Sequence, residues 1–461
     1  MSTQLTREKF GRKAAPVKIL HVGLGNFTRA HQAWYTEHAE DADEWGIAAF
    51  TGRRPLMADL LTPQDGLYTL ITKEASGNAF EVISSVVAVH PASDFQSFIS
   101  YFASPELAIV TTTVTEVGYC RRPDGSLDVE DDLVVADLET LRNTEVHDLG
   151  SVELSTAPAK VLAGLLARRE AGAGALTILP CDNLPDNGSA FHKVVADAAR
   201  EVDASLIEWM DENVVWATCM VDRITPATSD EDRAEAEQVQ GYTDASPVPT
   251  EPFSEWVISG QFPAGRPNWE SAGAQIVDDV EPYEQRKLWM LNGSHSLMAY
   301  AAPILGHETV ADAIVDPVVR GWVQSWWEEA GSGLSVEWED YAKALLERYE
   351  NPNIRHLLAQ IAHDGSQKIP VRIAPTLINQ RKQGLMPSSA VKAVAAWMLH
   401  LLGNGAPVVD KNAEKVSSKL GSDMVENATA VLDYVAPELN GDSELVNAIT
   451  AAVEEILSHR K

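Results

Sequence analysis

Lys18-Ile-Leu-His-Val22 runs directly into Gly23-Leu-Gly25-Asn-Phe-Thr28, and this stretch decides the fold. The apolar run predicts a short strand, the glycines predict a tight turn, and the segment from Arg29 to Glu40 predicts a helix. Gly23 permits the turn, and Gly25 lets a backbone amide approach a pyrophosphate at the helix N-terminus. Thr28 stands where the third glycine of a dinucleotide-binding turn is expected. A plain glycine-rich turn is the alternative.

Further strand-like runs follow this turn and alternate with helical patterns such as 94–102 and 157–170. The runs are 45–51, 68–72, 81–89, 107–114, 176–179 and 214–220. This alternation predicts an α/β fold with a mostly parallel, doubly wound sheet, in which a ligand lies outside the carboxyl ends of the strands. Polar clusters follow three of the runs, at Thr115-Glu116, 181–185 and 221–226.

The composition changes around Pro247 to Pro267, where Pro, Gly and aromatic residues replace clear periodicity. We therefore expect a Rossmann-type dinucleotide-binding domain at residues 1–265 and a mostly helical substrate and catalytic domain at residues 266–461. The helices expected in the second part span 310–329, 338–349, 388–402, 411–433 and 443–458.

Lys287-Leu-Trp-Met-Leu-Asn292-Gly-Ser-His295 carries the chemistry expected of the second domain. At about 100° per residue of a regular helix, Glu284 lies about 60°, His295 about 80° and Asn292 about 140° from Lys287. Leu291 and Met298 fall inside this arc, so the arc is expected to be largely buried. The alternative is an amphipathic helix with a snorkelling lysine and a core histidine.

Hydride transfer from a secondary alcohol needs a proton acceptor and donors for the emerging carbonyl oxygen. Lys287 can accept the proton if burial lowers its pKa, and the Asn183 and Asn292 amides can donate to the oxygen. His295 can orient the substrate hydroxyl, and Glu284 can pass the proton to solvent. Three structural alternatives remain: Asn183 as a turn-capping amide, Asp222-Arg223 as a structural ion pair, and Glu284 as a first-turn helix carboxylate.

The net charge of the chain restricts the classes of binding partner that we expect. Lys and Arg number 36 against 67 Asp and Glu, which gives a net charge of −31 and disfavours nucleic acid and anionic membranes. Three cysteines, Cys120, Cys181 and Cys219, form no C-x-x-C pair, so the sequence indicates neither a disulfide framework nor a metal site. No apolar signal segment or membrane span is evident, and we expect a cytoplasmic protein.

Six motifs, taken together and in order, resemble the polyol-specific long-chain dehydrogenases. They are Gly23-x-Gly25-x-Phe27-x-Arg29-Ala30-His31-Gln32, Gln64-Asp65-x-Leu67-Tyr68, Thr113-x-Thr115-Glu116-x-Gly118-Tyr119, Cys181-Asp182-Asn183-Leu184, Val221-Asp222-Arg223-Ile224-Thr225-Pro226 and Lys287-x4-Asn292-x2-His295. The resemblance extends from near residue 18 to the C-terminus.

The resemblance implies a metal-independent NAD(P)-dependent monomer, with its active site between a Rossmann-type and a helical domain. It implies Lys287 as the general base, Asn183 and Asn292 as oxyanion amides, His295 as the orienting residue and Glu284 as the proton relay. We assign cofactor binding to Gly23, Gly25, Asn26, Phe27, Arg53, Arg54, Thr115 and Glu116. Asp222 matches an active-site aspartate of the family, and we assign it to substrate binding. D-mannitol and D-fructose are the expected small-molecule pair, with D-fructuronate and D-mannonate as the alternative.

Two departures from the family pattern concern specificity. NAD-using members tend to carry an acidic residue after the second strand, whereas this chain has Arg53-Arg54, which suits a 2′-phosphate, so NADP is an alternative to NAD. Lys368 matches a substrate-binding lysine, but Gln360 replaces an expected arginine. Arg372 can instead bind a substrate carboxylate, or it is a surface residue.

Two other functional classes remain open at this level. A nucleotide-sensing binding protein would keep the fold and need no proton acceptor. A structural scaffold would use the polar arc around Lys287 only for packing.

Overall fold

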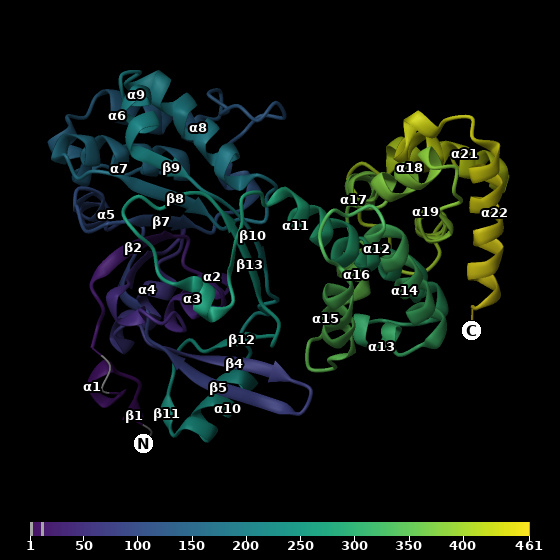
Figure 1. Cartoon of the computed structure of the whole chain (residues 1–461), viewed down its shortest axis with the longest axis horizontal. Helices are drawn as coiled ribbons and strands as arrows, with labels where there is room; N and C mark the ends of the chain where they lie inside the picture. The colour runs from purple at the N-terminus through teal and green to yellow at the C-terminus, as the bar shows by residue number, and fades with distance from the viewer. Residues whose placement is uncertain (1–2, 11–12, 461) are drawn as a thin grey trace. The chain divides into compact units, whose positions relative to one another are not determined.

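The computed structural model describes residues 3–10 and 13–460, and the chain forms two compact units, residues 1–281 and 282–461 (Figure 1). Unit 1 contains a six-stranded parallel sheet in the order β6-β3-β2-β7-β8-β9. Its strands are β2 (Val17–Val22), β3 (Gly46–Phe50), β6 (Val86–His90), β7 (Ile109–Thr112), β8 (Leu176–Pro180) and β9 (Val214–Trp216). The strand order reverses direction at β2, where a ligand crevice is expected. The predicted doubly wound sheet is confirmed.

Each face of this sheet has its own core. Leu20 of β2 packs with residues of α7 (Ala157–Ala171) and α8 (Asn187–Val202), which cover one face. Ile19, the preceding residue, belongs to the core on the opposite face, together with Tyr35 and Trp256. The alternation of side chains along a strand explains why neighbours in β2 enter different cores.

Two runs expected as single strands are each divided. Residues 81–89 contain the end of β5 (Gly77–Ile83), which pairs antiparallel with β4 (Tyr68–Glu74), and then β6. Between them the Glu37 carboxylate accepts hydrogen bonds from Ser84. The run 214–220 likewise divides into β9 and β10 (Thr218–Asp222), and β10 pairs with β13 (Glu255–Ser259). Tertiary pairing divides the runs, although their apolar pattern is continuous.

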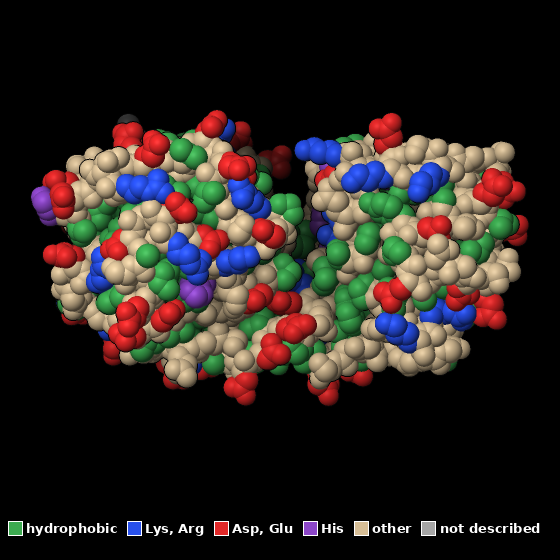
Figure 2. Space-filling model, turned by 90° about the horizontal axis from the view of Figure 1, so that it is seen from above, with side chains coloured by type: hydrophobic (Ala, Val, Ile, Leu, Met, Phe, Trp, Pro, Cys, Tyr) green, Lys and Arg blue, Asp and Glu red, His purple; other side chains and the backbone are tan. Residues whose placement is uncertain are grey.

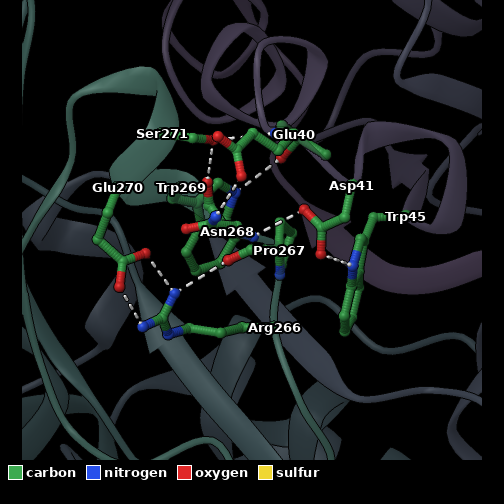
Figure 3. A network of polar contacts seen from close by, with 10 residues as sticks. Glu40, Asp41, Trp45, Arg266, Pro267, Asn268, Trp269, Glu270 and Ser271 are labelled. Atoms are coloured by element: carbon green, nitrogen blue, oxygen red, sulfur yellow. Dashed lines mark hydrogen bonds and ion pairs between the residues drawn. The ribbon is translucent and has the colours of Figure 1, made fainter.

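The segment after residue 265 is tied to unit 1 by the polar network of Figure 3. The Asn268 amide N–H donates to Asp41 at 2.8 Å, and the Glu40 N–H donates to the Ser271 hydroxyl at 2.9 Å. Arg266 pairs with Glu270 through two 2.6 Å hydrogen bonds. Unit 1 therefore extends to residue 281, beyond the boundary expected at 265/266.

Unit 2 is helical, as predicted for the C-terminal part. Its longer helices are α12 (Gly293–Ala301), α14 (Pro317–Gly331), α15 (Glu339–Glu350), α17 (Gly365–Arg372), α18 (Ala374–Lys382), α19 (Ser388–Leu401), α21 (Met424–Val435) and α22 (Ser443–Ser458). The expected helix 310–329 is broken, because the Asp316 carboxylate caps a new helix at Pro317. The expected helix 411–433 is also broken, where Asp423 caps α21.

Acidic side chains are spread over the surfaces of both units on the face shown in Figure 2, in keeping with the net charge of −31. None of the helices in the part of the chain that the structure describes has the length and apolarity to span a bilayer.

Candidate functional site

The turn after β2 has the geometry expected of a dinucleotide-binding loop. Gly23 has φ +105°, and a Cβ there would lie 2.4 Å from the Thr113 carbonyl oxygen, so only glycine fits. A Cβ at Gly25 would meet only the Gly23 carbonyl oxygen, at 3.7 Å. Open space over Gly25 fits the close approach of a pyrophosphate. The expected helix 29–40 begins earlier and is divided into α2 (Asn26–Ala30) and α3 (Gln32–Glu37) at His31.

The other residues predicted to bind the cofactor lie around the carboxyl ends of β2, β3 and β7. Asn26 is held by hydrogen bonds to the Pro226 carbonyl and from Arg29, and Phe27 stacks on His31. Thr115 precedes the short helix η3 (Glu116–Tyr119), in which Glu116 pairs with Arg121 at 3.1 Å. Sequence separation is large, yet the parallel sheet brings these residues to one edge.

Arg53 and Arg54 are exposed and follow β3, the strand beside β2. The positive charge of Arg53 lowers the pKa of Lys160 in α7, although burial of the Lys160 ammonium contributes more. A second basic residue therefore lies near Arg53.

Asp182 and Asn183 follow β8. The buried Asp182 carboxylate accepts from the Val114 N–H at 2.6 Å, the Thr112 hydroxyl at 2.8 Å and the Tyr119 hydroxyl at 2.6 Å. Burial raises the pKa of Asp182 despite these bonds. Asp182 thus holds the ends of β7 and β8 together, and the neighbouring Asn183 is exposed.

Asp222 ends β10 and is buried. The next residue, Arg223, donates from Nη1 to the Ala30 carbonyl at 2.5 Å and from Nε to the Glu251 carbonyl at 3.3 Å, and it lies over the Trp34 ring. Arg223 is therefore a structural residue that joins three segments of unit 1.

The Lys287–Asn292 segment forms a π-helical segment (η6) between α11 (Glu281–Arg286) and α12. The regular-helix angles expected for Asn292 and His295 therefore do not apply, because the chain is locally wider. Glu284, Lys287 and Asn292 are half-buried, while Leu291 and Met298 are buried as expected. π-helical insertions of this kind occur frequently at functional sites.

Side chains from distant helices bind the carbonyl groups of η6. The Trp326 and Trp327 indoles of α14 donate to the Trp289 and Met290 carbonyls at 2.9 and 3.1 Å. The Tyr349 hydroxyl of α15 donates to the Leu291 carbonyl at 3.2 Å. These donors stabilise the widened turn that carries Lys287.

His295 lies in a buried, basic environment. Its ring contacts Tyr349 and His356 at centroid distances of 4.9 and 5.0 Å, and its Nε2 has no hydrogen-bond partner among the described residues. Burial lowers the pKa of His295 well below 6.5, and the charges of His356, Arg348 and Arg372 lower it further. His295 is therefore neutral near pH 7.

Lys368 and Arg372 both lie on α17. Lys368 Nζ donates to the Ile361 carbonyl at 3.1 Å, and burial, with the charge of Arg372, lowers the Lys368 pKa. Arg372 Nη1 donates to the Ser296 hydroxyl at 3.2 Å and the Asn292 carbonyl at 3.4 Å. The alternative that Arg372 is a surface residue is excluded, because it is half-buried against η6 and α12.

Sequence reasoning missed Arg348, His356, Trp326 and Trp327. The two tryptophans belong to an amphipathic helix, a pattern that predicts core residues only. His356 follows Asn351-Pro-Asn353, a stretch typical of a loop, and no spacing relates it to His295. Within the described residues, no cluster of three or more His, Cys, Asp or Glu side chains is placed to hold a metal ion.

Two domain families match the chain, one over most of unit 1 and the other over most of unit 2. The mannitol dehydrogenase Rossmann domain matches residues 17–271, and the mannitol dehydrogenase C-terminal domain matches residues 279–457. D-mannonate oxidoreductase of Escherichia coli (strain K12) is 36% identical, over 95% of this chain and 93% of its own.

Two solved structures are similar over nearly the whole chain. A substrate-free D-sorbitol dehydrogenase has a TM-score of 0.87 and 28% identity, covering 97% of this chain and 95% of its own. Pseudomonas fluorescens mannitol 2-dehydrogenase, in a ternary complex with NAD and D-mannitol, has a TM-score of 0.75 and 30% identity, covering 99% and 96%. The chain therefore belongs to the mannitol dehydrogenase family of oxidoreductases.

Proposed function

We propose that this protein is a zinc-independent, NAD-dependent oxidoreductase that interconverts a secondary alcohol of a sugar acid or polyol with the corresponding ketone. Membership of the family and the structure of a relative with NAD and D-mannitol support the reaction class and cofactor. The residues around Gly23, Gly25, Asn26 and Phe27 would hold the dinucleotide, which supplies the hydride acceptor when bound.

Lys287 acts as the proton acceptor in this proposal. Its neutral Nζ takes the proton of the substrate hydroxyl, the O–H electron pair forms the C=O bond, and the hydride leaves the same carbon. The Asn292 amide donates to the oxygen as charge develops, and we assign the same role to Asn183 of unit 1. Glu284 then accepts the proton from Lys287 and passes it to solvent.

His295 orients the substrate through Nε2. This nitrogen is buried and has no partner among the described residues, a costly state unless a ligand supplies one. Because the ring is neutral, it can bond to a hydroxyl without adding charge near Lys287.

The charges around His295 favour a sugar acid over a neutral polyol. Arg348 and Arg372 both lie close enough to lower the pKa of His295, and Lys368 lies close to Arg372, although the Asp364 and Asp410 carboxylates also lie near Lys368. Such a basic cluster, in a chain with a net charge of −31, is suited to a carboxylate at short range. This cluster is the observation that carries the proposal, and it makes D-mannonate and D-fructuronate the preferred pair.

D-mannitol and D-fructose remain the second candidate. Lys368, the implied polyol-binding lysine, is present and anchored by the Ile361 carbonyl. We keep NAD as the proposed cofactor, and the exposed Arg53 and Arg54 keep NADP as the alternative.

Initial rates with D-mannonate and D-mannitol, each with NAD and with NADP, test these assignments. We expect kcat/KM to be highest for D-mannonate with NAD. A higher value for D-mannitol would favour the second candidate, whereas the absence of nicotinamide reduction with both substrates would contradict the proposed function.

A further inference from the structure

A buried chain of hydroxyl groups and one imidazole lies beneath the Gly23–Thr28 turn. His21 of β2 is fully buried, and its Nδ1 lies 2.8 Å from the Thr111 hydroxyl. Its Nε2 lies 2.7 Å from the Thr28 hydroxyl and 3.0 Å from the Thr113 hydroxyl. The Thr28 and Thr113 hydroxyls are 2.8 Å apart, and Thr113 donates to the Gly23 carbonyl at 2.8 Å.

One arrangement of protons satisfies every contact, with the His21 Nε2–H shared between the Thr28 and Thr113 hydroxyls. Burial lowers the pKa of His21 to about 3, so the ring is neutral and carries one proton. The Thr113 proton is used on the Gly23 carbonyl, so Thr28 must donate to Thr113, and His21 Nε2–H must donate to Thr28. Nδ1 then accepts from Thr111.

This chain connects strand, helix and turn. Thr111 and His21 belong to β7 and β2, Thr28 belongs to α2, and Gly23 forms the turn. In the usual dinucleotide-binding pattern a third glycine lets the helix pack closely against the strand. Here a threonine occupies that position, and its hydroxyl makes the helix–strand contact.

We propose that Thr28 is a positioning residue for the dinucleotide site, acting through His21 and Thr113 to fix the orientation of the Gly23 carbonyl and the turn that follows it. The inference rests on the proposed function, because it assumes that this turn binds the dinucleotide. Thr28 itself is fully buried and acts through its neighbours.

Thr28→Val tests the inference, with NADH binding measured by fluorescence quenching and turnover measured at saturating cofactor. Valine keeps the shape and removes the hydroxyl. We expect the Kd for NADH to rise about tenfold, equivalent to about 1.4 kcal/mol, with kcat changed much less than KM for the cofactor. Thr28→Ser, which keeps the hydroxyl, restores binding.

Thr177→Val is the matched control. Thr177 is also fully buried, and its hydroxyl donates to the Gln261 carbonyl at 3.1 Å, at the amino end of β8. We expect it to lower the melting temperature without weakening NADH binding. Should Thr28→Val not fold, Thr113→Val removes the donor to Gly23 and is expected to weaken binding in the same way.

The outcomes separate the inference from the proposed function. A wild-type protein that binds NADH, with a Thr28→Val variant that binds equally well, would overturn the inference alone. Equal weakening in Thr177→Val would overturn it too, since the effect would then be general loss of stability. A wild-type protein that binds neither NADH nor NADPH would contradict the proposed function and the inference together.

Discussion

The Trp326 indole N–H donates a 2.9 Å hydrogen bond to the Trp289 carbonyl, inside the π-helical segment that begins at Lys287. Both residues are buried. The bond gives the Trp289 carbonyl a hydrogen-bond donor in a segment that lacks the regular α-helical hydrogen-bond pattern. The position of Lys287 therefore depends on α14, a helix that begins about 30 residues later in the chain (Figure 1).

Trp326→Phe removes this donor. We expect it to destabilise unit 2 by about 3 kcal/mol or more, because ring volume is lost and a buried carbonyl loses its partner, and to lower kcat by displacing Lys287. Trp322→Phe, on the same helix, is the control, measured in the same urea unfolding and rate assays. Equal effects of the two changes on kcat would contradict the positioning role of Trp326.

Arg372→Leu tests the preference for a sugar acid. We expect kcat/KM for D-mannonate to fall by about 10² to 10³, the effect of removing a charge-assisted contact of about 3 to 4 kcal/mol. The value for D-mannitol should fall far less. Arg355→Leu removes the same charge from an exposed position of unit 2 and should leave the ratio of the two substrates unchanged. Equal losses for both substrates in Arg372→Leu would argue against carboxylate recognition.

Arg53→Glu combined with Arg54→Glu tests cofactor selection. Because a carboxylate repels a 2′-phosphate and can bond to a ribose hydroxyl, the double variant should favour NAD over NADP by about tenfold or more relative to the wild type. Arg233→Glu, an exposed change elsewhere in unit 1, is the control. Unchanged selectivity would remove Arg53 and Arg54 from the cofactor site.

Much of the fold is predictable because its signals are local. The apolar run before Gly23 and the regular alternation after it predict the parallel sheet, and the helical periodicity of residues 443–458, with Asp442 as the cap, predicts α22. The break between β5 and β6 is not predictable in this way, because it depends on Glu37 binding Ser84 from another segment.

The candidate site is likewise predictable only where its signals are local in the sequence. Lys287, Asn292 and His295 are recognisable from their spacing, but the π-helical geometry depends on Trp326 and Trp327, which are distant in sequence. His356 lies beside His295 only because α15 returns the chain to α12. The roles assigned to Lys287, Asn292, His295, Asn183, Glu284 and Asp222 all remain predictions.

His400 predicts a pH-dependent stability. It is buried, and burial lowers its pKa to about 4, although Asp410 opposes the shift. The unfolded chain, with an ordinary histidine pKa of about 6.5, therefore binds a proton that the folded chain does not. Its contribution to stability is full above about pH 6.5 and falls by about 1.4 kcal/mol per pH unit between pH 6.5 and 4.

His400→Phe removes this proton uptake. We measure the free energy of unfolding by urea denaturation at pH 7 and at pH 5. We expect the loss of stability between these two pH values to be about 2 kcal/mol smaller in the variant than in the wild type. His147→Phe, at an exposed position, should leave the slope unchanged. If His400→Phe retained the wild-type slope, His400 would not be held neutral in the fold.

In the proposed reaction the Lys287 amine receives the substrate proton, and Lys287→Ala removes that amine. The measurement is the single-turnover rate of NADH formation from D-mannonate and D-mannitol, together with the Kd for NADH. We predict a fall in the rate of at least about 10³, in the range of general-base losses, with the Kd within about twofold of the wild type. Lys343→Ala, at an exposed position of unit 2, should change neither value. A rate in Lys287→Ala equal to that of the wild type would show that Lys287 is not the proton acceptor.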